Sequence, residues 1–264
     1  MDAALDPVTL EYDGAVAIVT LNDPKTLNAL TFPMFNRLRE VLDEVELKAR
    51  AMILSGSGKS FCSGANLAGG LSYKVEDPKD ADCGEVLETH VNPAMSRLRT
   101  LNVPWVSAVR GSAAGAGASL ALAGDLVVAS ETATFIQAFS RIGLVPDAGA
   151  THLLVRTIGR VRANELMLLG GKLSAEKALD WGLVNKVVAD EKLEEEAMAL
   201  ASALANGPAS IAAIRRLSWM AVDATFNDTL WNERELQRNA GRTEDFREGT
   251  AAFLEKRPAQ FKGR

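Results

Sequence analysis

The sequence has few of the residues on which several classes of protein depend. Only two of its 264 residues are cysteine and two are histidine, and neither Cys62 nor Cys83 has the neighbours of a metal-ligand motif. A disulfide-rich scaffold and a structural metal site are therefore not indicated. The formal net charge is −5 and no block of Lys and Arg occurs, which argues against a nucleic-acid-binding surface. We expect no metal and no nucleic-acid partner.

Long apolar runs are also missing. No stretch approaches the roughly 20 apolar residues of a membrane helix. The opening MDAALDPVTL lacks the basic and apolar regions of a signal peptide. Hydrophobic residues make up 47% of the chain and charged residues 24%, which is ordinary for a globular protein. We therefore expect a cytoplasmic protein in a reduced compartment, with no membrane partner.

The first part of the chain alternates predicted strands and helices, which indicates an α/β fold. Residues 8–12 and 16–21 predict a hairpin around Asp13-Gly14. Thr31 is a candidate cap for a helix whose apolar face would be Met34, Leu38, Val41, Leu42 and Val45. Further strands are predicted at 52–55, 103–109 and 125–129, with helices at 85–101 and 148–157. Between them, the polar segment 68–85 predicts a mobile flap.

The strand pattern stops near residue 205. After it come predicted helices at 208–222, 226–240 and 243–254, the last with Phe246, Phe253 and Leu254 on one face. Apolar helix faces without strand partners must pack on their own core or on another subunit. We therefore divide the chain into a core, 1–205, and a helical region, 206–264.

A segment of small residues, RGSAAGAGASLALAGD, lies where a strand should lead into a helix, so 111–117 are predicted to be the turn between them. A turn without side chains lets a ligand touch the backbone. The first N–H groups of the helix are unpaired and lie at the positive end of its dipole. They could bind a phosphate or an oxygen that becomes negative during a reaction.

A second segment, FCSGANL at 61–67, also leaves a backbone N–H beside small residues, near Ala65. With LNDPKTLNAL at 21–30, these elements resemble the crotonase (enoyl-CoA hydratase/isomerase) superfamily, whose segments read like FCAGADL and NG-x-A-x-GGG. The resemblance runs from residue 16 to the end of the chain. It implies a spiral of ββα turns and a C-terminal helical region that forms a homotrimer or a dimer of trimers. A dinucleotide site would need glycine where Leu120 stands, and a purely structural turn is the other alternative.

The resemblance places the N–H groups of Ala65 and Ala116 around the thioester oxygen of an acyl-CoA. Removing a proton from the α-carbon of a thioester puts charge on that oxygen, and two preorganised donors contribute about 3 kcal/mol each. The small residues Ser63, Gly64 and Gly115 would let the thioester approach. Coenzyme A would then be part of the substrate, and we expect no separate cofactor.

Hydratase relatives carry two catalytic glutamates, and this chain has Ser119 and Phe139 at those positions. Hydration needs one group to activate water and another to manage the α-proton. A carboxylate follows at Asp147, in FSRIGLVPDAG. This motif is similar to that of the isomerases that open the ring of 1,2-epoxyphenylacetyl-CoA and also shift enoyl-CoA double bonds. The resemblance implies an isomerase in which Asp147 shuttles the proton, because one base suffices for a double-bond shift.

Several alternatives for this segment stay open. Asp147 could cap the helix predicted at 148–157, or act as a nucleophile, as in aroyl-CoA dehalogenase relatives or a thioesterase-like member. Weak hydratase (lyase) activity and a catalytically silent CoA-binding protein are also possible. Ser119 fits packing better than nucleophilic attack, since no histidine is nearby in sequence. If Asp147 is the base, its apolar neighbours should desolvate it and raise its pKa: Phe135, Phe139, Ile142 and Leu144.

The resemblance also implies residues that bind coenzyme A. Lys25 and Leu27 would lie along the nucleotide, and Ala65, Asn66 and Leu67 would contact the pantetheine. Phe261 and Lys262, in the tail PAQFKGR, would reach the ligand of a neighbouring subunit. A solvated loop and a frayed terminus are the alternatives for these two regions. Asn66 stands where the family usually has aspartate, and His90 is a further candidate for the acyl pocket.

Overall fold

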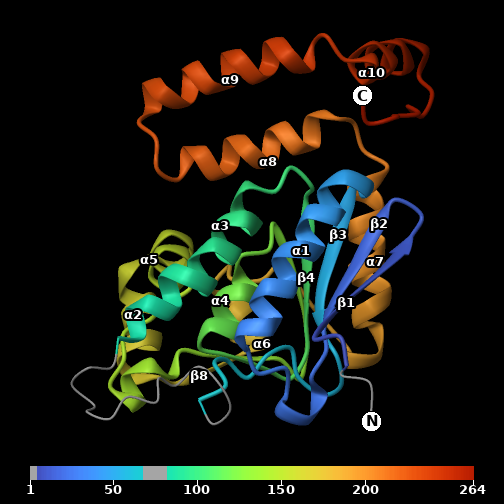
Figure 1. Cartoon of the computed structure of the whole chain (residues 1–264). Helices are drawn as coiled ribbons and strands as arrows, with labels where there is room; N and C mark the ends of the chain where they lie inside the picture. Colours follow the sequence, from blue (N-terminus) through green and yellow to red (C-terminus); the bar gives the residue numbers. More distant parts are fainter. Residues whose placement is uncertain (1–4, 68–81) are drawn as a thin grey trace.

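A computed structural model describes residues 5–67 and 82–264. Its main sheet begins with an antiparallel hairpin, as predicted, and continues in parallel (Figure 1). The strands of this sheet, in spatial order, are β1 (Val8–Asp13), β2 (Val16–Leu21), β3 (Ala51–Gly56), β4 (Trp105–Val109), β6 (Leu126–Ser130) and β9 (Lys186–Val188). The central strands are almost continuously apolar because helices cover both faces of the sheet.

A second, three-stranded sheet consists of β5 (Ser112–Ala114), β7 (Thr134–Ile136) and β8 (Lys172–Ser174). Chain segments β4–β5–α4 and β6–β7–α5 each give one strand to each sheet, which is the expected spiral of ββα turns. The expectation of a plain turn over 111–117 is wrong at β5. Ser-Ala-Ala carries no strand pattern of its own and becomes a strand only by pairing with β7.

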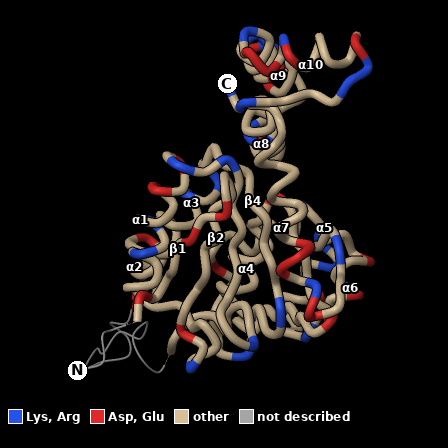
Figure 2. The backbone as a smooth tube through the Cα atoms, turned by 90° about the vertical axis from the view of Figure 1, so that its right-hand side faces the viewer, with Lys and Arg blue, Asp and Glu red and all other residues tan. Residues whose placement is uncertain are grey.

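Helices cover the main sheet on two sides (Figures 1 and 2). Helix α1 (Phe32–Lys48) lies over β1 and β2, and α4 (Ala116–Leu122) lies against β4 on the same side. Thr31 caps α1 as predicted, because its hydroxyl accepts a hydrogen bond from the Met34 N–H at 3.3 Å, and the predicted apolar face is buried. Helix α7 (Leu193–Ala205) covers the other side.

The helix predicted at 85–101 is three consecutive helical pieces. They are α2 (Cys83–Val86), a π-helical turn (Leu87–Val91) and α3 (Asn92–Thr100). Pro93 lies in the first turn of α3 and has no N–H to continue the preceding hydrogen-bond ladder, which explains the wider turn before it. Residues 68–81 of the predicted flap lie outside the described residues.

The three helices predicted near the C-terminus are confirmed as α8 (Ser210–Ala221), α9 (Phe226–Ala240) and α10 (Glu244–Glu255). Arg215 fastens α8 to the core: its Nε donates to Asp125 Oδ2 at 2.6 Å, and another guanidinium nitrogen donates to the Leu98 carbonyl at 2.7 Å. Helix α9 lies along α8 and has no buried residue. The remaining helices are α5 (Ala150–Leu169) and α6 (Ala175–Asp180).

Within the described ranges no single helix has the length and apolar content of a membrane span. One bent pair, Asp190–Ala205 with Ser210–Ala221 at 105°, meets both criteria only when the two are taken together.

Candidate active site

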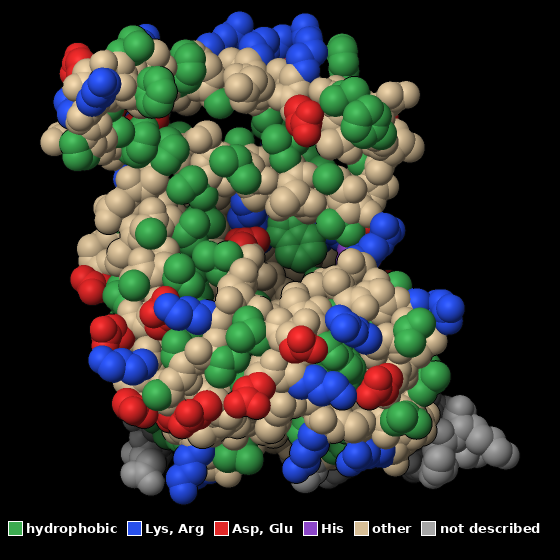
Figure 3. Space-filling view, turned by 180° about the vertical axis from the view of Figure 1, so that it is seen from behind, with side chains coloured by type: hydrophobic (Ala, Val, Ile, Leu, Met, Phe, Trp, Pro, Cys, Tyr) green, Lys and Arg blue, Asp and Glu red, His purple; other side chains and the backbone are tan. Residues whose placement is uncertain are grey.

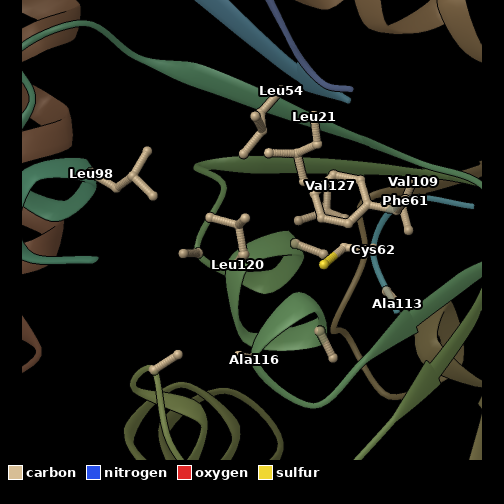
Figure 4. Close-up of a cluster of buried hydrophobic side chains, with 14 of the residues drawn as sticks. Leu21, Leu54, Phe61, Cys62, Leu98, Val109, Ala113, Ala116, Leu120 and Val127 are labelled. Carbon is tan, nitrogen blue, oxygen red and sulfur yellow. The ribbon is translucent and has the colours of Figure 1, made fainter. Parts of the chain in front are cut away.

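The site is built where the loop after β3 pairs with β5 and meets the start of α4. The Cys62 N–H donates to the Ser112 carbonyl at 3.0 Å, and the Ala114 N–H donates to the Cys62 carbonyl at 2.9 Å. Figure 4 shows Cys62 beside α4, with Leu120 and Ala113 close to it. This parallel pairing fixes the second small-residue segment against the first.

Glycine is required at two positions of this contact. A Cβ on Gly117 would lie 2.6 Å from the Cys62 sulfur, and a Cβ on Gly64 would lie 2.7 Å from the Ala114 carbonyl oxygen. Gly64 also has φ 94°, a backbone conformation that side chains disfavour. The small residues therefore serve to bring the two backbones together.

The N–H groups predicted to form the oxyanion hole are both without an acceptor among the described residues. Ala65 pairs with Leu30, but the hydrogen bonds of that pairing use the Asn66 N–H and the Gly64 carbonyl, so the Ala65 N–H is left out. Ala116 is the first residue of α4, where no intrahelical acceptor exists. Two donors are therefore available at the predicted positions.

Ala65, Ala116 and Asp147 line one cavity of about 80 Å³. The sequence places these three residues far apart, and the fold brings them together. Among the described lining residues Asp147 is the one carboxylate, and the other walls are mainly apolar: Leu30, Phe35, Leu67, Cys83, Val86, Leu87, Val91 and Leu144. The cavity is thus lined by the two residues that carry the predicted donors, by one acid and by mainly apolar side chains.

The Asp147 side chain is half-buried, and its Oδ1 atom is buried with no hydrogen-bond partner among the described residues. Burial raises the pKa of Asp147 from 3.8 to about 6, the predicted direction, because desolvation disfavours the charged carboxylate. Of the four residues expected to desolvate it, Leu144 lines the same cavity. Ile142 is 54% exposed instead.

The alternative of Asp147 as a helix cap is wrong. Helix α5 begins at Ala150, its N-cap is Gly149 with φ 81°, and no side chain caps it. Ala148 also has a positive φ, 51°, so the backbone turns sharply directly after Asp147. The helix continues to Leu169 rather than ending near 157, although Gly159 interrupts it with φ 77°.

Ser119 and Phe139 do not line this cavity. Ser119 is fully buried, and its hydroxyl lies 3.2 Å from the Asp147 main-chain oxygen and 3.4 Å from that of Gly115. Phe139, in a 3-10 turn (Ala138–Ile142), is buried with its ring against Gly115. Neither residue supplies an ionisable group.

The cavity walls include residues of the helix predicted at 85–101 that the sequence analysis did not name individually. Val86, Leu87 and Val91 come from the helical segment before α3, and their apolar spacing was the signal that could have found them. His90 does not line the cavity. Its ring centroid lies 4.4 Å from that of Phe32, and its Nδ1 is 3.2 Å from the Asn36 side-chain oxygen.

Comparison with known proteins identifies the family. A family model described as enoyl-CoA hydratase/isomerase matches residues 11–264. The chain belongs to the enoyl-CoA hydratase/isomerase family. It is 44% identical to the 1,2-epoxyphenylacetyl-CoA isomerase of Escherichia coli K12, covering 94% of this chain and 95% of that one. It is 35% identical to the trans-2-decenoyl-[acyl-carrier-protein] isomerase of Streptococcus mutans, covering 97% of this chain and 98% of that one.

Solved structures agree with this assignment. The crystal structure of an enoyl-CoA hydratase subunit from Geobacillus kaustophilus superposes with a TM-score of 0.89, at 34% identity, and 98% of each chain is covered. Relatives are therefore named both as isomerases and as hydratases. An acyl-CoA substrate follows from the family, and the crotonase-type fold is confirmed.

The loop that carries Lys25 and Leu27 is attached to the oxyanion segment. The Ser63 hydroxyl donates to the Thr26 carbonyl at 2.9 Å, and the Ser63 N–H donates to the Leu27 carbonyl at 2.9 Å. Lys25 is exposed and Leu27 is 41% exposed, so both are accessible to a ligand. Contact of Lys25 and Leu27 with the nucleotide stays a prediction.

Asn28 is a structural residue of this site that the sequence analysis missed. It is fully buried, and its Nδ2 donates to the carbonyls of Ser57 and Ser60 at 2.9 and 2.8 Å. Those residues begin the loop that ends at Ala65. Asn28 lies within the LNDPKTLNAL segment quoted above. A single asparagine gives no sequence pattern from which its hydrogen bonds to a distant loop could be predicted.

Phe261 and Lys262 are not brought to the cavity within one chain. The Phe261 ring packs against Gly249 of α10, and the Lys262 N–H donates to Asp245 Oδ1 at 2.7 Å. Figure 1 shows the C-terminus beside α10, away from α4. Contact of these residues with a CoA would need another subunit, as the family resemblance implies.

The two cysteines differ in environment. Cys62 is fully buried, and burial raises the pKa of its thiol to about 12, whereas Cys83 is free and exposed at the cavity. Among the residues that the structure describes, no three His, Cys, Asp or Glu side chains are grouped in a way that could hold a metal ion.

Proposed function

We propose that this family member is an acyl-CoA isomerase in which Asp147 moves the proton. The carboxylate lifts a proton from the α-carbon of a 3-enoyl-CoA, and the electron pair moves onto the thioester oxygen. The N–H groups of Ala65 and Ala116 stabilise that enolate oxygen. Asp147 then returns the proton to the γ-carbon, which gives the conjugated 2-enoyl-CoA. Coenzyme A is part of the substrate, and no separate cofactor takes part.

One observation supports this proposal above the others. Among the described residues the cavity has one carboxylate, Asp147, whose buried Oδ1 lacks a partner, and it is also lined by Ala65 and Ala116, whose N–H groups have no acceptor. A double-bond shift needs one base, whereas hydration needs a second group to activate water. Ser119 and Phe139, at the positions where the resemblance implies glutamates, supply no such group. This supports isomerase over hydratase activity.

The proposed substrate is an enoyl-CoA or a ring-epoxide acyl-CoA. The E. coli relative is named as an isomerase of 1,2-epoxyphenylacetyl-CoA. The aliphatic and aromatic lining from Leu30, Phe35 and Leu87 suits an apolar acyl group in either case. We also propose that the active form is a homotrimer or a dimer of trimers, supported by the exposed apolar side chains of α8–α10.

The experiment is to incubate the purified protein with a 3-enoyl-CoA and follow the absorbance of the conjugated product. Asp147→Asn should lower kcat by about 1,000-fold or more, because the amide cannot accept the proton, while substrate KM stays within about threefold. Full activity in this variant would show that Asp147 is not the base. Crotonyl-CoA tests hydration in parallel, and a covalent adduct on Asp147 would identify a nucleophile instead.

A further inference from the structure

Ser119 joins the two halves of the candidate site. Its hydroxyl oxygen lies 3.2 Å from the main-chain oxygen of Asp147 and 3.4 Å from that of Gly115. Gly115 is the N-cap of α4, so its position determines where the Ala116 N–H points. One buried hydroxyl thus lies within hydrogen-bond distance of both the carbonyl of the acid residue and the carbonyl that begins the oxyanion helix.

The Asp147 segment has few other attachments. Residues 141–145 are exposed, and the Asp147 main-chain oxygen otherwise accepts only from the Ala150 N–H, at 2.9 Å, among the described residues. Ala148 and Gly149 follow with φ 51° and 81°. A left-handed conformation at Ala148 is unfavourable and persists only where surrounding contacts hold it. Within the described part of the chain, the hydrogen bond from Ser119 is the one side-chain contact of the Asp147 main chain.

We infer that Ser119 is a positioning residue, whose hydroxyl fixes the Asp147 carboxylate relative to the Ala116 N–H. This inference rests on the proposed function, because it assigns Ser119 a task in the proton transfer between an acid and an oxyanion hole. Ser119 is fully buried and does not line the cavity among the described residues, so we assign it a positioning role rather than a catalytic one. Misplacing a reacting group by about 1 Å can cost 100-fold in rate.

A purely structural explanation exists and predicts something different. A serine that bonds the carbonyl four residues earlier is common inside helices and has no consequence for catalysis. Under that explanation loss of the hydroxyl would alter thermal stability and leave turnover unchanged in the folded protein. If the hydrogen bond to Asp147 positions the base, loss of the hydroxyl should lower turnover in the folded protein.

The test compares Ser119→Ala, Ser119→Thr and Ser119→Val. Thr and Val have nearly the same shape, but only Thr keeps the hydroxyl, so steric effects cancel between them. Ser107→Ala is the matched control, because Ser107 is also fully buried and its hydroxyl has no partner among the described residues. Each variant is checked for folding by circular dichroism and thermal melting before kinetics with 3-enoyl-CoA.

We expect Ser119→Ala and Ser119→Val to lower kcat by 10- to 100-fold with KM within about threefold, and Thr to restore most of the rate. Ser107→Ala should keep kcat within about twofold. Equal kcat in the Ser119→Thr and Ser119→Val variants, or unchanged kcat in Ser119→Ala, would overturn this inference. The proposed function would be unaffected by that result, because Asp147→Asn tests it separately. An inactive wild-type protein would overturn both.

Discussion

At the residue scale, the main chain of Asp147 is held by hydrogen bonds, whereas its carboxylate is left available for chemistry. Its main-chain oxygen is bonded to Ser119 and Ala150, whereas its carboxylate Oδ1 has no partner among the described residues. Burying a carboxylate without a partner destabilises its charged form, which makes the ionised group a stronger base. A base whose pKa lies near the working pH is efficient because it is both ionised and basic enough to take a proton.

This environment predicts how activity depends on pH. The pKa of Asp147 is raised to about 6, and the base must be ionised, so kcat/KM should fall as pH drops through 6 and be constant above about 7. At pH 5 about a tenth of the plateau value should remain. The measurement is kcat/KM from pH 4.5 to 8.5 with a 3-enoyl-CoA. A profile that stays flat down to pH 4.5 would contradict an elevated pKa at the base.

At the element scale, the sequence predicted those elements whose apolar residues repeat with a clear period. The hairpin β1–β2, helix α1 with its Thr31 cap, and the three C-terminal helices occur where predicted. The short strands β5, β7 and β8 were missed, because three residues carry too little pattern and depend on distant partners. Pairing, rather than propensity, makes these segments strands.

The candidate site shows the same limit. Ala65, Ala116 and Asp147 were found from family motifs, and the structure places them at one cavity. Asn28 and the hydroxyl contact of Ser119 could not be found, because both act through hydrogen bonds to main-chain carbonyls of segments remote in sequence. Nothing in residue type or spacing encodes such a contact.

The contact between the loop after β3 and helix α4 leads to a prediction about Gly117. Alanine is the better helix former, yet a Cβ here would lie 2.6 Å from the Cys62 sulfur and 2.7 Å from its carbonyl oxygen. Gly117→Ala should therefore separate the two oxyanion donors. We expect the free energy of unfolding to fall by about 1–3 kcal/mol and kcat to fall at least tenfold.

Denaturant unfolding and isomerase kinetics measure these two effects. Gly171→Ala is the control, since a Cβ at Gly171 meets nothing within 4 Å and its φ is not in the left-handed region. It should change neither stability nor rate noticeably. If Gly117→Ala retained full activity, close backbone approach would not be needed for the oxyanion hole.

At the scale of the whole molecule, the helical region extends from the core instead of covering it (Figures 1 and 2). Figure 3 shows many hydrophobic side chains over this region, seen from behind. Large exposed apolar side chains of α8–α10 include Ile214, Phe226, Leu230, Trp231, Phe246, Phe253 and Leu254. A surface of this kind on a chain that stays monomeric would be an aggregation hazard, so contact with other subunits is the better explanation.

The same region carries Phe261 and Lys262, held by the buried Asp245 carboxylate, which accepts from the N–H groups of Lys262 and Gly263 at 2.7 and 2.8 Å. Hydrogen bonds to the ionised form keep the pKa of Asp245 below its usual value despite desolvation. The tail is therefore a fixed part of the extension. If a neighbouring subunit's CoA lies against it, assembly and substrate affinity should change together.

That coupling can be tested by weakening the exposed apolar face. Trp231 is 63% exposed and Phe253 is 83% exposed. The double variant Trp231→Glu/Phe253→Glu should shift the protein from a trimer or hexamer to a monomer in analytical ultracentrifugation, because it places charge in an apolar interface. KM for the acyl-CoA should rise at least tenfold if neighbouring tails contribute to binding.

Val161→Glu, at a 74% exposed position on α5 of the core, is the control and should leave both mass and KM unchanged. A wild-type protein that sediments as a monomer would contradict the assembly, and a dissociated variant with normal KM would show that Phe261 and Lys262 do not bind a neighbour's ligand.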